Sequence, residues 1–257
     1  MSDNPNDVAT VLITGAGQRI GRALALDFAG RGWQVAISYS TSGQAAQKLA
    51  TEIETAGGRA LALKADLNDP DEVAGLIPAC AEGLAAPDCL VNNASIFEHD
   101  DIAGLNMESW RHHLSVNLQA PVFLAQAFAA ALPDGAKGNI INIIDQRVWR
   151  LTPRFFSYTI SKSGLWTATQ TLALALAPRI RVNAIGPGPT LPSPRQSDDA
   201  FDRQRRATPL GYGPTLDEIC RAARFILDAP SMTGQMIALD GGQHLAWETP
   251  DVLAADE

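Results

Sequence analysis

The sequence predicts a single α/β domain in which helices cover both faces of a doubly wound parallel sheet. Three observations lead to this prediction. Apolar, β-branched runs alternate with Ala- and Leu-rich stretches of helical period, the apolar runs contain few polar positions, and 257 residues suffice for one large core. Because no linker, repeat or low-complexity segment divides the sequence, residues 1–257 are expected to form one domain.

Seven apolar runs are expected to form the strands of this sheet. In chain order they cover residues 8–14, 34–39, 60–65, 88–93, 139–144, 179–185 and 235–240. Strands buried on both faces of a parallel sheet read as nearly continuous apolar runs, which is the pattern seen here.

Six helices are expected between these strands. They cover residues 19–31, 43–56, 70–84, 108–131, 155–177 and 215–228. In the first helix, Ile20, Leu24 and Phe28 recur one turn apart and share one face. The third begins after Asp69, a capping residue, with Pro70 at the first helical position.

One long stretch shows neither the helical nor the strand pattern of apolar residues. Residues 186–199, "GPGPTLPSPRQSDD", contain four prolines, which lack the backbone donor that regular structure needs. Long loops in compact domains are usually functional, so we expect a lid over the substrate at about residues 187–213.

Composition and charge narrow the classes of partner. The net charge of −8 argues against nucleic acid or an anionic membrane as the main partner. The three cysteines, Cys80, Cys89 and Cys220, lack metal-ligand spacing, so buried thiols in a reducing compartment and no metal are expected. The polar N-terminus does not resemble a signal or transit peptide, and residues 163–178, the most apolar helix candidate, are too short to cross a membrane. We therefore expect a cytoplasmic protein.

A glycine-rich turn, "TGAGQRIG", joins the first strand to the first helix. Gly15, Gly17 and Gly21 permit a tight turn, a close backbone approach and close helix packing. The free N–H groups at the start of the helix then face a pyrophosphate. The position of the turn between strand and helix favours a dinucleotide site over a merely structural turn.

The end of the second strand indicates which dinucleotide is bound. A cofactor without a 2′-phosphate usually meets an Asp or Glu here, and "ISYSTS" contains neither. The hydroxyls of Ser40 and Thr41 and the charge of Arg19 suit a phosphate, which favours NADP(H) over NAD(H). An alternative is that the hydroxyl residues only cap helix 43–56, which either cofactor would allow.

A pair of reactive side chains follows the fifth strand. Tyr158 and Lys162 are four residues apart and share one helix face. The ammonium is expected to lower the pKa of the phenol, ordinarily near 10, so that Tyr158 becomes a usable acid. Asn117 interrupts an apolar helix, either as a satisfied core amide or as a link in a proton relay to Lys162.

Seven motifs resemble those of the short-chain dehydrogenase/reductase family over nearly the whole chain: "TGAGQRIG", "ADLND", "VNNAS", "SVNLQAP", "YTISK", "RVNAIGPG" and "LDGGQHL". The resemblance implies a Rossmann-type seven-stranded parallel sheet, a homotetramer, and a proton relay of Asn117, Tyr158 and Lys162. It also implies cofactor contacts, which together with Ser40 and Thr41 are Gly15, Arg19, Ile20, Asp66, Leu67, Asn93, Ala94, Ser95, Tyr158, Lys162, Pro187, Gly188 and Thr190.

Two departures from the family pattern are informative. Arg19 occupies the position of the usual middle glycine, and Asp145 stands thirteen residues before Tyr158, where the family usually has its catalytic Ser. Both departures, and Phe97 after the fourth strand, resemble the pteridine reductase subgroup and the related dihydromonapterin and dihydrofolate reductases. The resemblance implies a substrate site lined by Arg19, Ser95, Phe97, Asp145 and Tyr158.

The carboxylate separates two substrate classes. A Ser hydroxyl donates to a carbonyl that gains charge, whereas an ionised Asp145 cannot donate and repels an alkoxide. In a pterin, hydride adds to a C=N bond and the proton goes to nitrogen; there Asp145 can bond Tyr158 and the amino-pyrimidine donors, and Phe97 can hold the flat ring. We therefore expect an NADPH-dependent reductase of a dihydropterin or dihydrofolate, with Asp145, Tyr158, Lys162 and Asn117 as its catalytic set.

Several alternatives remain at this stage. A carbonyl reductase acting on a 3-oxoacyl thioester or another ketone would need Asp145 protonated, or Tyr158 acting alone. A regulatory NADP-binding protein with little turnover is disfavoured by the intact catalytic set. Asp145 alone could be a cap and Phe97 a core or rim aromatic, while Arg147, Trp149 and Arg150 have no role assigned by the sequence.

Overall fold

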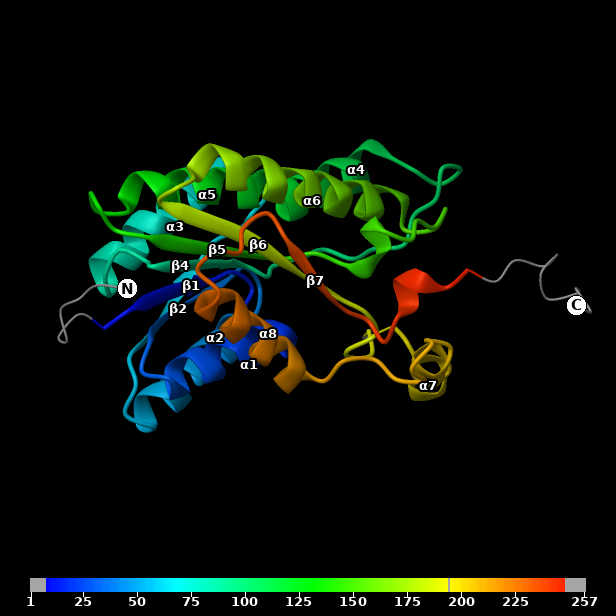
Figure 1. Ribbon diagram of the computed structural model, residues 1–257, viewed down its shortest axis with the longest axis horizontal. Coiled ribbons are helices and arrows are strands. Elements are labelled where there is room, and N and C mark those ends of the chain that lie inside the picture. The colour runs from blue at the N-terminus through cyan, green and yellow to red at the C-terminus, as the bar shows by residue number, and fades with distance from the viewer. Residues whose placement is uncertain (1–7, 194, 248–257) are drawn as a thin grey trace, which may run out of the picture.

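The computed structural model describes residues 8–193 and 195–247. In this part of the chain, seven parallel strands form one sheet in the order β3-β2-β1-β4-β5-β6-β7 (Figure 1). The chain starts at the centre, moves outward to β3, crosses to β4 and continues to β7. The predicted Rossmann-type, doubly wound sheet is confirmed, and its switch point lies between β1 and β4, where such sheets bind ligands.

Every predicted apolar run overlaps a strand. The strands are β1 (Thr10–Ile13), β2 (Gln34–Tyr39), β3 (Ala60–Lys64), β4 (Cys89–Asn92), β5 (Gly138–Ile143), β6 (Ile180–Pro187) and β7 (Met236–Leu239). The second is correct at both ends, whereas β6 runs two residues beyond the predicted boundary because it continues beside β7.

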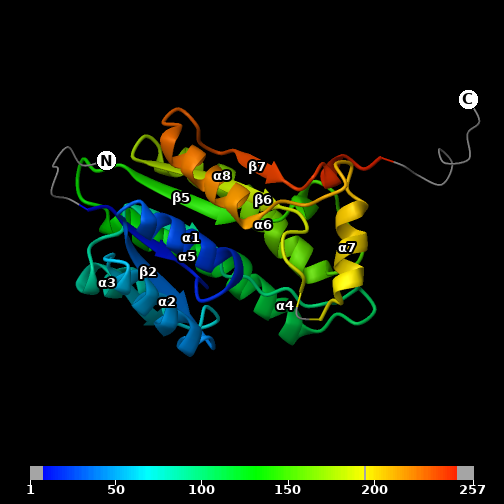
Figure 2. The ribbon, with the colours of Figure 1, turned by 90° about the horizontal axis from the view of Figure 1, so that it is seen from below.

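Helices cover both faces of the sheet (Figures 1 and 2). They are α1 (Arg19–Gly30), α2 (Gly43–Thr55), α3 (Pro70–Gly83), α4 (Met107–Leu114), α5 (Ala120–Ala131), α6 (Phe156–Leu176), α7 (Asp198–Arg206) and α8 (Leu216–Asp228). Shorter turns are η1 (Ser115–Gln119), η2 (Gln146–Val148) and η3 (Gln243–Leu245). Helices α1, α2 and α8 lie on one face of the sheet, and α3 to α6 lie on the other.

Successive side chains along each strand point to opposite faces of the sheet, and this alternation divides the core into two layers. On β1, Val11 and Ile13 pack among residues of α1, α2 and α8, whereas Leu12 packs among residues of α3 and α5. All three side chains are fully buried. The two layers hold the sheet rigid, and its carboxyl edge therefore offers fixed positions for a site.

The structure corrects one predicted helix and contains one helix that was not predicted. The single helix expected at 108–131 is interrupted by η1, a π-helical turn that contains Asn117. The predicted lid, 187–213, contains α7, which begins at Asp198, four residues after Pro194 in the sequence, and is capped by Ser197, whose hydroxyl accepts from the Ala200 N–H. Figure 2 shows α7 beyond the carboxyl ends of β5 to β7.

The α4–η1–α5 segment, Met107–Ala131, is long and apolar enough to cross a membrane by length and composition alone, and an 18-residue stretch within it has a mean hydropathy of 1.3. Core helices of water-soluble proteins meet the same criteria. Here α5 packs on α3, and its Leu124 and Phe128 are fully buried in the core. These contacts favour the core-helix interpretation.

Candidate active site

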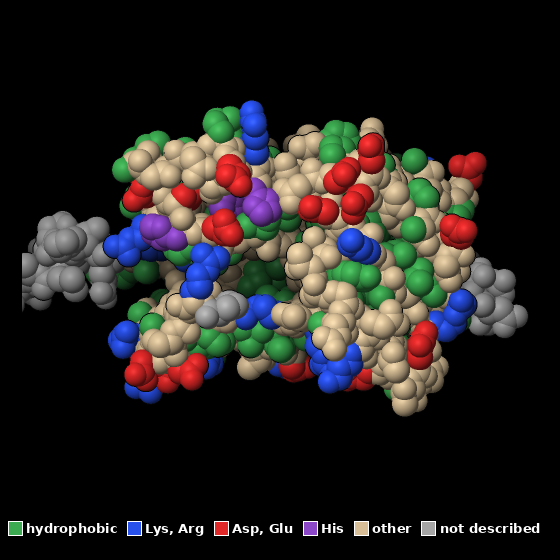
Figure 3. Space-filling view, turned by 180° about the vertical axis from the view of Figure 1, so that it is seen from behind, with side chains coloured by type: hydrophobic (Ala, Val, Ile, Leu, Met, Phe, Trp, Pro, Cys, Tyr) green, Lys and Arg blue, Asp and Glu red, His purple; other side chains and the backbone are tan. Residues whose placement is uncertain are grey.

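A cavity of about 750 Å³ opens at the carboxyl edge of the sheet, between the turn after β1 and the lid segment. Figure 3 shows the molecule hollowed near the middle of the face opposite to that of Figure 1, with Lys and Arg side chains beside the hollow. The cavity is lined by every predicted cofactor and substrate residue: Gly15, Arg19, Ile20, Ser40, Thr41, Asp66, Leu67, Asn93, Ala94, Ser95, Phe97, Asp145, Tyr158, Lys162, Pro187, Gly188 and Thr190.

The glycine-rich turn packs closely against the segment that follows β4. Gly15 has a φ of +62°, and a Cβ on it would lie 2.9 Å from the Cα of Ala94. A Cβ on Gly21 would lie 2.5 Å from Nδ2 of Asn93, which bonds the turn through the carbonyls of Thr14 and Gly15. Side chains at these glycines would displace the turn, so glycine is needed to place the start of α1 beside the cavity, where its free N–H groups can bind an anion.

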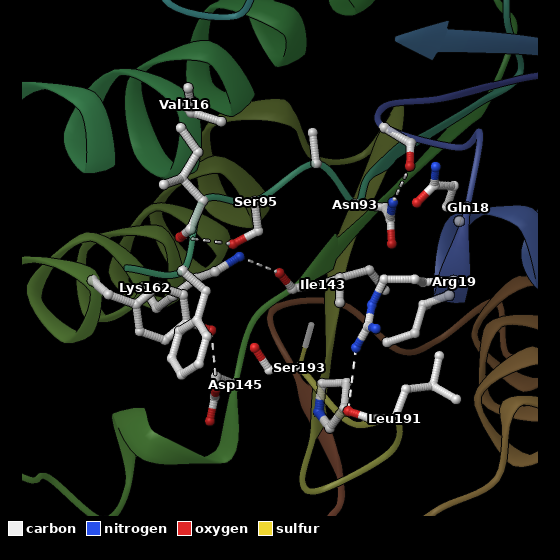
Figure 4. Close-up of a pocket in the computed structure, with 18 of the residues that line it drawn as sticks. Gln18, Arg19, Asn93, Ser95, Val116, Ile143, Asp145, Lys162, Leu191 and Ser193 are labelled. Carbon is white, nitrogen blue, oxygen red and sulfur yellow. Dashed lines mark hydrogen bonds between the residues drawn. The ribbon is translucent and has the colours of Figure 1, made fainter. Parts of the chain in front are cut away.

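Arg19 joins the turn to the lid segment. Its guanidinium donates to the carbonyl oxygens of Pro192 at 2.7 Å and Leu191 at 3.2 Å (Figure 4). Its backbone has a φ of +55°, the left-handed conformation that suits glycine and costs another residue about 1 kcal/mol or more. The side chain therefore occupies a strained glycine position, and its contacts to the lid offset part of that cost.

The end of β2 has the predicted character. Ser40 and Thr41 line the cavity, and the nearby carboxylate, Asp66, comes from the segment after β3. Hydrogen bonds from the backbone and side chain of Asn68 hold the pKa of Asp66 below its usual value. Ser42 occupies the N-cap position of α2 but makes no side-chain cap bond within the described residues, so the capping alternative gains no support there.

The carboxylate after β5 contacts the phenol directly. The Tyr158 hydroxyl donates to Oδ2 of Asp145 at 2.9 Å (Figure 4). The other oxygen of Asp145 accepts from the backbone N–H of Arg147 at 2.8 Å, which caps η2. Asp145 is therefore both a turn cap and a partner of Tyr158, two roles that the sequence analysis had set against each other.

The electrostatics correct one expectation about Tyr158. Burial, then the neighbouring Asp145, raises the pKa of Tyr158 well above its usual value instead of lowering it. Lys162 donates to the backbone oxygen of Ile143 at 2.8 Å, and its ammonium nitrogen lies 5.9 Å from the centroid of the Tyr158 ring. The carboxylate is closer to the phenol than the ammonium is, so Tyr158 keeps its proton and acts as a hydrogen-bond donor.

Burial shifts the other two groups as well. It raises the pKa of Asp145, an effect that the guanidinium of Arg147 opposes. It lowers the pKa of Lys162 to about 8, because the side chain is only 1% exposed. Shifts of this kind cluster at catalytic sites, where a group must exchange protons near neutral pH.

Asn117 lies behind this group. Its Nδ2 donates to the backbone oxygen of Ile96 and to the hydroxyl of Ser161, and its Oδ1 accepts from the N–H of Ile96. The amide is thus a satisfied core group that anchors the segment after β4. The structure places its side chain against Ile96 and Ser161 instead of Lys162, and its role in a proton relay stays a prediction.

The predicted aromatic wall is larger than Phe97 alone. One face of Phe97 stacks on Phe155, with ring centroids 4.3 Å apart, and the Tyr158 ring meets Phe97 edge-on at 4.7 Å. The guanidinium of Arg147 lies 4.9 Å and 5.5 Å from the centroids of Phe155 and Phe97. Neither Phe155 nor Arg147 was assigned to the site by the sequence analysis. Residues in turns follow no helical or strand periodicity, so the sequence does not show where their side chains point.

Other cavity residues were also missed by the sequence analysis. They include Gln18, Gln146, Leu191, Ser193, Gln196, Phe201, Gln204 and Gln243. Most belong to the lid segment and α7. The stretch "SDDAFDRQRR" starts with acidic residues and ends with arginines, a charge pattern that favours a helix and could have predicted α7. Trp149 and Arg150 instead contact the C-terminal segment, at His244 and the backbone oxygen of Ala246.

Solved structures of high similarity share this architecture. The FolM alternative dihydrofolate reductase 1 of Brucella suis, solved in complex with NADP, is 51% identical and covers 95% of this chain and 98% of its own, with a TM-score of 0.92. The protein of the same name from Brucella canis, also with NADP, is 50% identical and covers 95% and 97%, with a TM-score of 0.93.

More distant relatives span most of the chain. The 3-oxoacyl-[acyl-carrier-protein] reductase of a Synechocystis species is 31% identical and covers 90% of this chain and 95% of its own. The family model described as short chain dehydrogenase matches residues 9–202, which include the turn after β1, Asp145, Tyr158 and Lys162. The chain therefore belongs to the short-chain dehydrogenase family.

Proposed function

We propose that this protein reduces a pterin-like substrate, a dihydropterin or a dihydrofolate, in an NADPH-dependent reaction. The observation that carries the proposal is the 2.9 Å hydrogen bond from Tyr158 to Asp145, a carboxylate where the resembled family usually has a hydroxyl. The two Brucella neighbours, which carry the name dihydrofolate reductase, support the same substrate class.

The cavity suits NADP(H). Gly15 and Gly21 leave a backbone cradle at the start of α1, Arg19 adds a cation, and Ser40 and Thr41 offer hydroxyl donors beyond β2. The Brucella neighbours were solved with NADP. When bound, NADPH would supply the hydride for the carbon of the substrate C=N bond. Lys162 lies deeper, at the end where the family resemblance implies contact with the nicotinamide ribose.

Tyr158 and Asp145 deliver the proton that the ring nitrogen needs. The raised pKa of Asp145 lets the carboxyl hold a proton. A protonated Asp145 donates to the phenol oxygen, which frees the Tyr158 hydrogen to go to the substrate nitrogen. When Asp145 is ionised, it accepts the hydrogen bond from the Tyr158 hydroxyl, whose oxygen lies 2.9 Å from Oδ2, and this hydrogen is then not available to the substrate. Proton delivery therefore depends on the pair and not on Tyr158 alone.

The substrate ring is held by groups of complementary chemistry. Asp145 accepts from amino-pyrimidine donors, Phe97 offers an aromatic surface backed by Phe155, and Arg19 bonds a ring oxygen or nitrogen. Because Arg19 now bonds the carbonyls of Leu191 and Pro192, we also propose that residues 187–213 act as a lid whose position depends on Arg19.

A parallel assay tests the function. NADPH oxidation is followed with a dihydropterin, dihydrofolate and an acetoacetyl thioester at equal concentrations. We expect turnover with at least one of the first two and little with the thioester. Efficient reduction of the thioester with both pterins ignored would establish the carbonyl reductase alternative and leave Asp145 as a cap.

Replacing Asp145 with Ser tests the role of the carboxylate. We expect Asp145→Ser to depress pterin turnover ten-fold or more, on the order of 1.4 kcal/mol in the barrier. Slow reduction of the thioester is expected to appear because a hydroxyl donor to a carbonyl is restored. Asp134→Ser, at an exposed turn before β5, is the control. Unchanged pterin kinetics in Asp145→Ser would remove the carboxylate from the mechanism.

Cofactor choice is tested at the end of β2. The unmodified protein is expected to prefer NADPH, and Ser40→Asp to shift the ratio of kcat/KM values toward NADH, because a carboxylate repels the 2′-phosphate and bonds ribose hydroxyls. Thr55→Asp, at the exposed far end of α2, serves as the control. Equal kinetics with both cofactors in the unmodified protein would contradict the assignment.

We further propose a cytoplasmic homotetramer. Large apolar side chains are exposed on the helices of the molecule, including Phe123 on α5 (51% exposed) and Leu174 on α6 (83% exposed). Exposed apolar residues of this size are common at subunit contacts. Light scattering of the purified protein measures the mass directly, and a monomer would contradict the proposal.

A further inference from the structure

Three buried polar side chains lie beside Tyr158, and the mechanism above does not use them. Asp100 precedes α4, His113 is on α4 and Ser157 is on α6, and their exposed fractions are 6%, 0% and 0%. The Ser157 hydroxyl donates a short hydrogen bond to Oδ2 of Asp100, and its oxygen lies 2.7 Å from Nδ1 of His113. Buried polar groups of this kind must satisfy one another, so they fix the elements that carry them.

Asp100 caps α6 from a distant part of the chain. Its backbone oxygen accepts from the N–H groups of Phe155 at 2.8 Å and Phe156 at 3.3 Å, and its carboxylate accepts from the N–H of Ser157 at 3.2 Å. A helix start leaves such N–H groups without partners and favours a negative charge. Tyr158 is the next residue, so Asp100 fixes the turn that carries the phenol.

His113 connects the same cluster to the segment that carries Phe97. Its Nε2 accepts from the backbone N–H of Glu98 at 3.2 Å, which requires this nitrogen to lack a proton. Its Nδ1 then carries the proton and faces the oxygens of Ser157 at 2.7 Å and Ser109 at 3.1 Å. Burial lowers the pKa of His113, which agrees with this neutral form.

The three residue types are those of a hydrolytic triad, but their order differs. In a nucleophilic triad the His stands between Ser and Asp and takes the hydroxyl proton. Here Ser157 stands between the other two, its hydroxyl already donates a hydrogen bond to Asp100, and its side chain is fully buried. The arrangement therefore serves to hold structure and not to attack a substrate.

We propose that Asp100, acting through Ser157 and His113, is a positioning residue for Tyr158 and Phe97. The cluster fixes the phenol from the α6 side and the aromatic wall from the Glu98 side, so that both face the cavity in one arrangement. Misplacing reacting groups by about 1 Å costs up to about 100-fold in rate. The expected kinetic effect rests on the proposed pterin reduction, whereas the effect on the start of α6 does not.

The test compares Asp100→Asn and Ser157→Ala with Asp101→Asn, an exposed neighbour that bonds only the Gly104 N–H among the described residues. In Asp100→Asn an amide NH₂ meets the donors of Ser157, so kcat for the pterin is expected to fall about 10- to 100-fold. The dissociation constant for NADPH, measured by fluorescence titration, is expected to stay within about two-fold of the unmodified value, because the cluster lies away from the nucleotide end. Ser157→Ala is expected to lower kcat several-fold, and Asp101→Asn to leave it unchanged.

Hydrogen exchange supplies a measurement that needs no turnover. Amides of residues 155–158 are expected to exchange about 10-fold faster in Asp100→Asn, while strand amides keep their protection. If Asp100→Asn does not fold, as judged by NADPH stoichiometry, Ser157→Ala decides by the same measurements. Normal kcat together with normal exchange in the folded variant would overturn the positioning role. A lack of pterin turnover in the unmodified protein would instead refute the proposed function, with exchange still deciding the cluster.

Discussion

Tyr158→Phe is expected to lower pterin turnover by about 100- to 10,000-fold, the range that general acid catalysis contributes. The substitution removes the hydroxyl that donates to Asp145 but keeps the ring that meets Phe97 edge-on at 4.7 Å. Binding of NADPH and of the substrate ring is therefore expected to change little. Measured by stopped-flow under single-turnover conditions, the loss should fall on the chemical step.

Thr167→Val is the matched control for Tyr158→Phe. It removes a hydroxyl from an exposed position of α6, where Thr167 bonds only its own helix backbone among described residues. We expect its kinetics to equal those of the unmodified protein. Full activity in Tyr158→Phe would show that another group supplies the proton.

The pH profile distinguishes the pair from an isolated phenol. The pKa of Asp145 is raised, so the carboxyl holds its proton at low pH and loses it as pH rises through that raised value. Since the proposed route needs the protonated carboxyl, kcat is expected to fall as pH rises through this pKa. In Tyr158→Phe the small residual rate is expected to lose this dependence, because Asp145 no longer has the phenol to pass a proton to.

The fold was predictable because its signals are local and repeated. Strands such as β7 are unbroken apolar runs, and α1 repeats Ile20, Leu24 and Phe28 on one face. Two features have weaker local signals. The π-helical turn at Asn117 leaves the apolar period of its helix intact, and α7 follows directly on a proline-rich stretch, so both were missed.

The members of the site were predictable, but their pairing was not. Motif spacing placed Tyr158 and Lys162 on one helix face and Asp145 at the end of β5, and all three line the cavity. Which group touches the phenol depends on side-chain direction at a turn, which spacing does not determine. The structure gives that contact to Asp145 and directs Lys162 to the backbone of Ile143, so the expected pKa shift of Tyr158 reverses its sign.

Lys162→Met is expected to abolish most activity and yet stabilise the protein without cofactor. The pKa of Lys162 falls from 10.5 to about 8 on folding, a shift that corresponds to roughly 3 kcal/mol of unfavourable burial of the charge. Removing the amine also leaves the oxygen of Ile143 without its donor, which costs about 1 kcal/mol. The net rise in the free energy of unfolding at pH 7 is therefore on the order of 2 kcal/mol, measured by urea denaturation.

The sign of this effect fixes its pH dependence. Below pH 8 Lys162 is charged in the folded and unfolded chains alike, so the cost of its burial is fully present. Between about pH 8 and 10.5 the unfolded chain binds more protons than the folded one, so the unmodified protein gains stability as pH rises. The advantage of Lys162→Met is expected to shrink over that window, whereas Lys48→Met, at an exposed position of α2, should show neither the gain nor the window. If Lys162→Met is less stable than the unmodified protein at pH 7, the amine makes stronger contacts than its bond to Ile143. The burial of its charge would then not be unfavourable in the protein without cofactor, and binding of the anionic cofactor would have no such cost to offset.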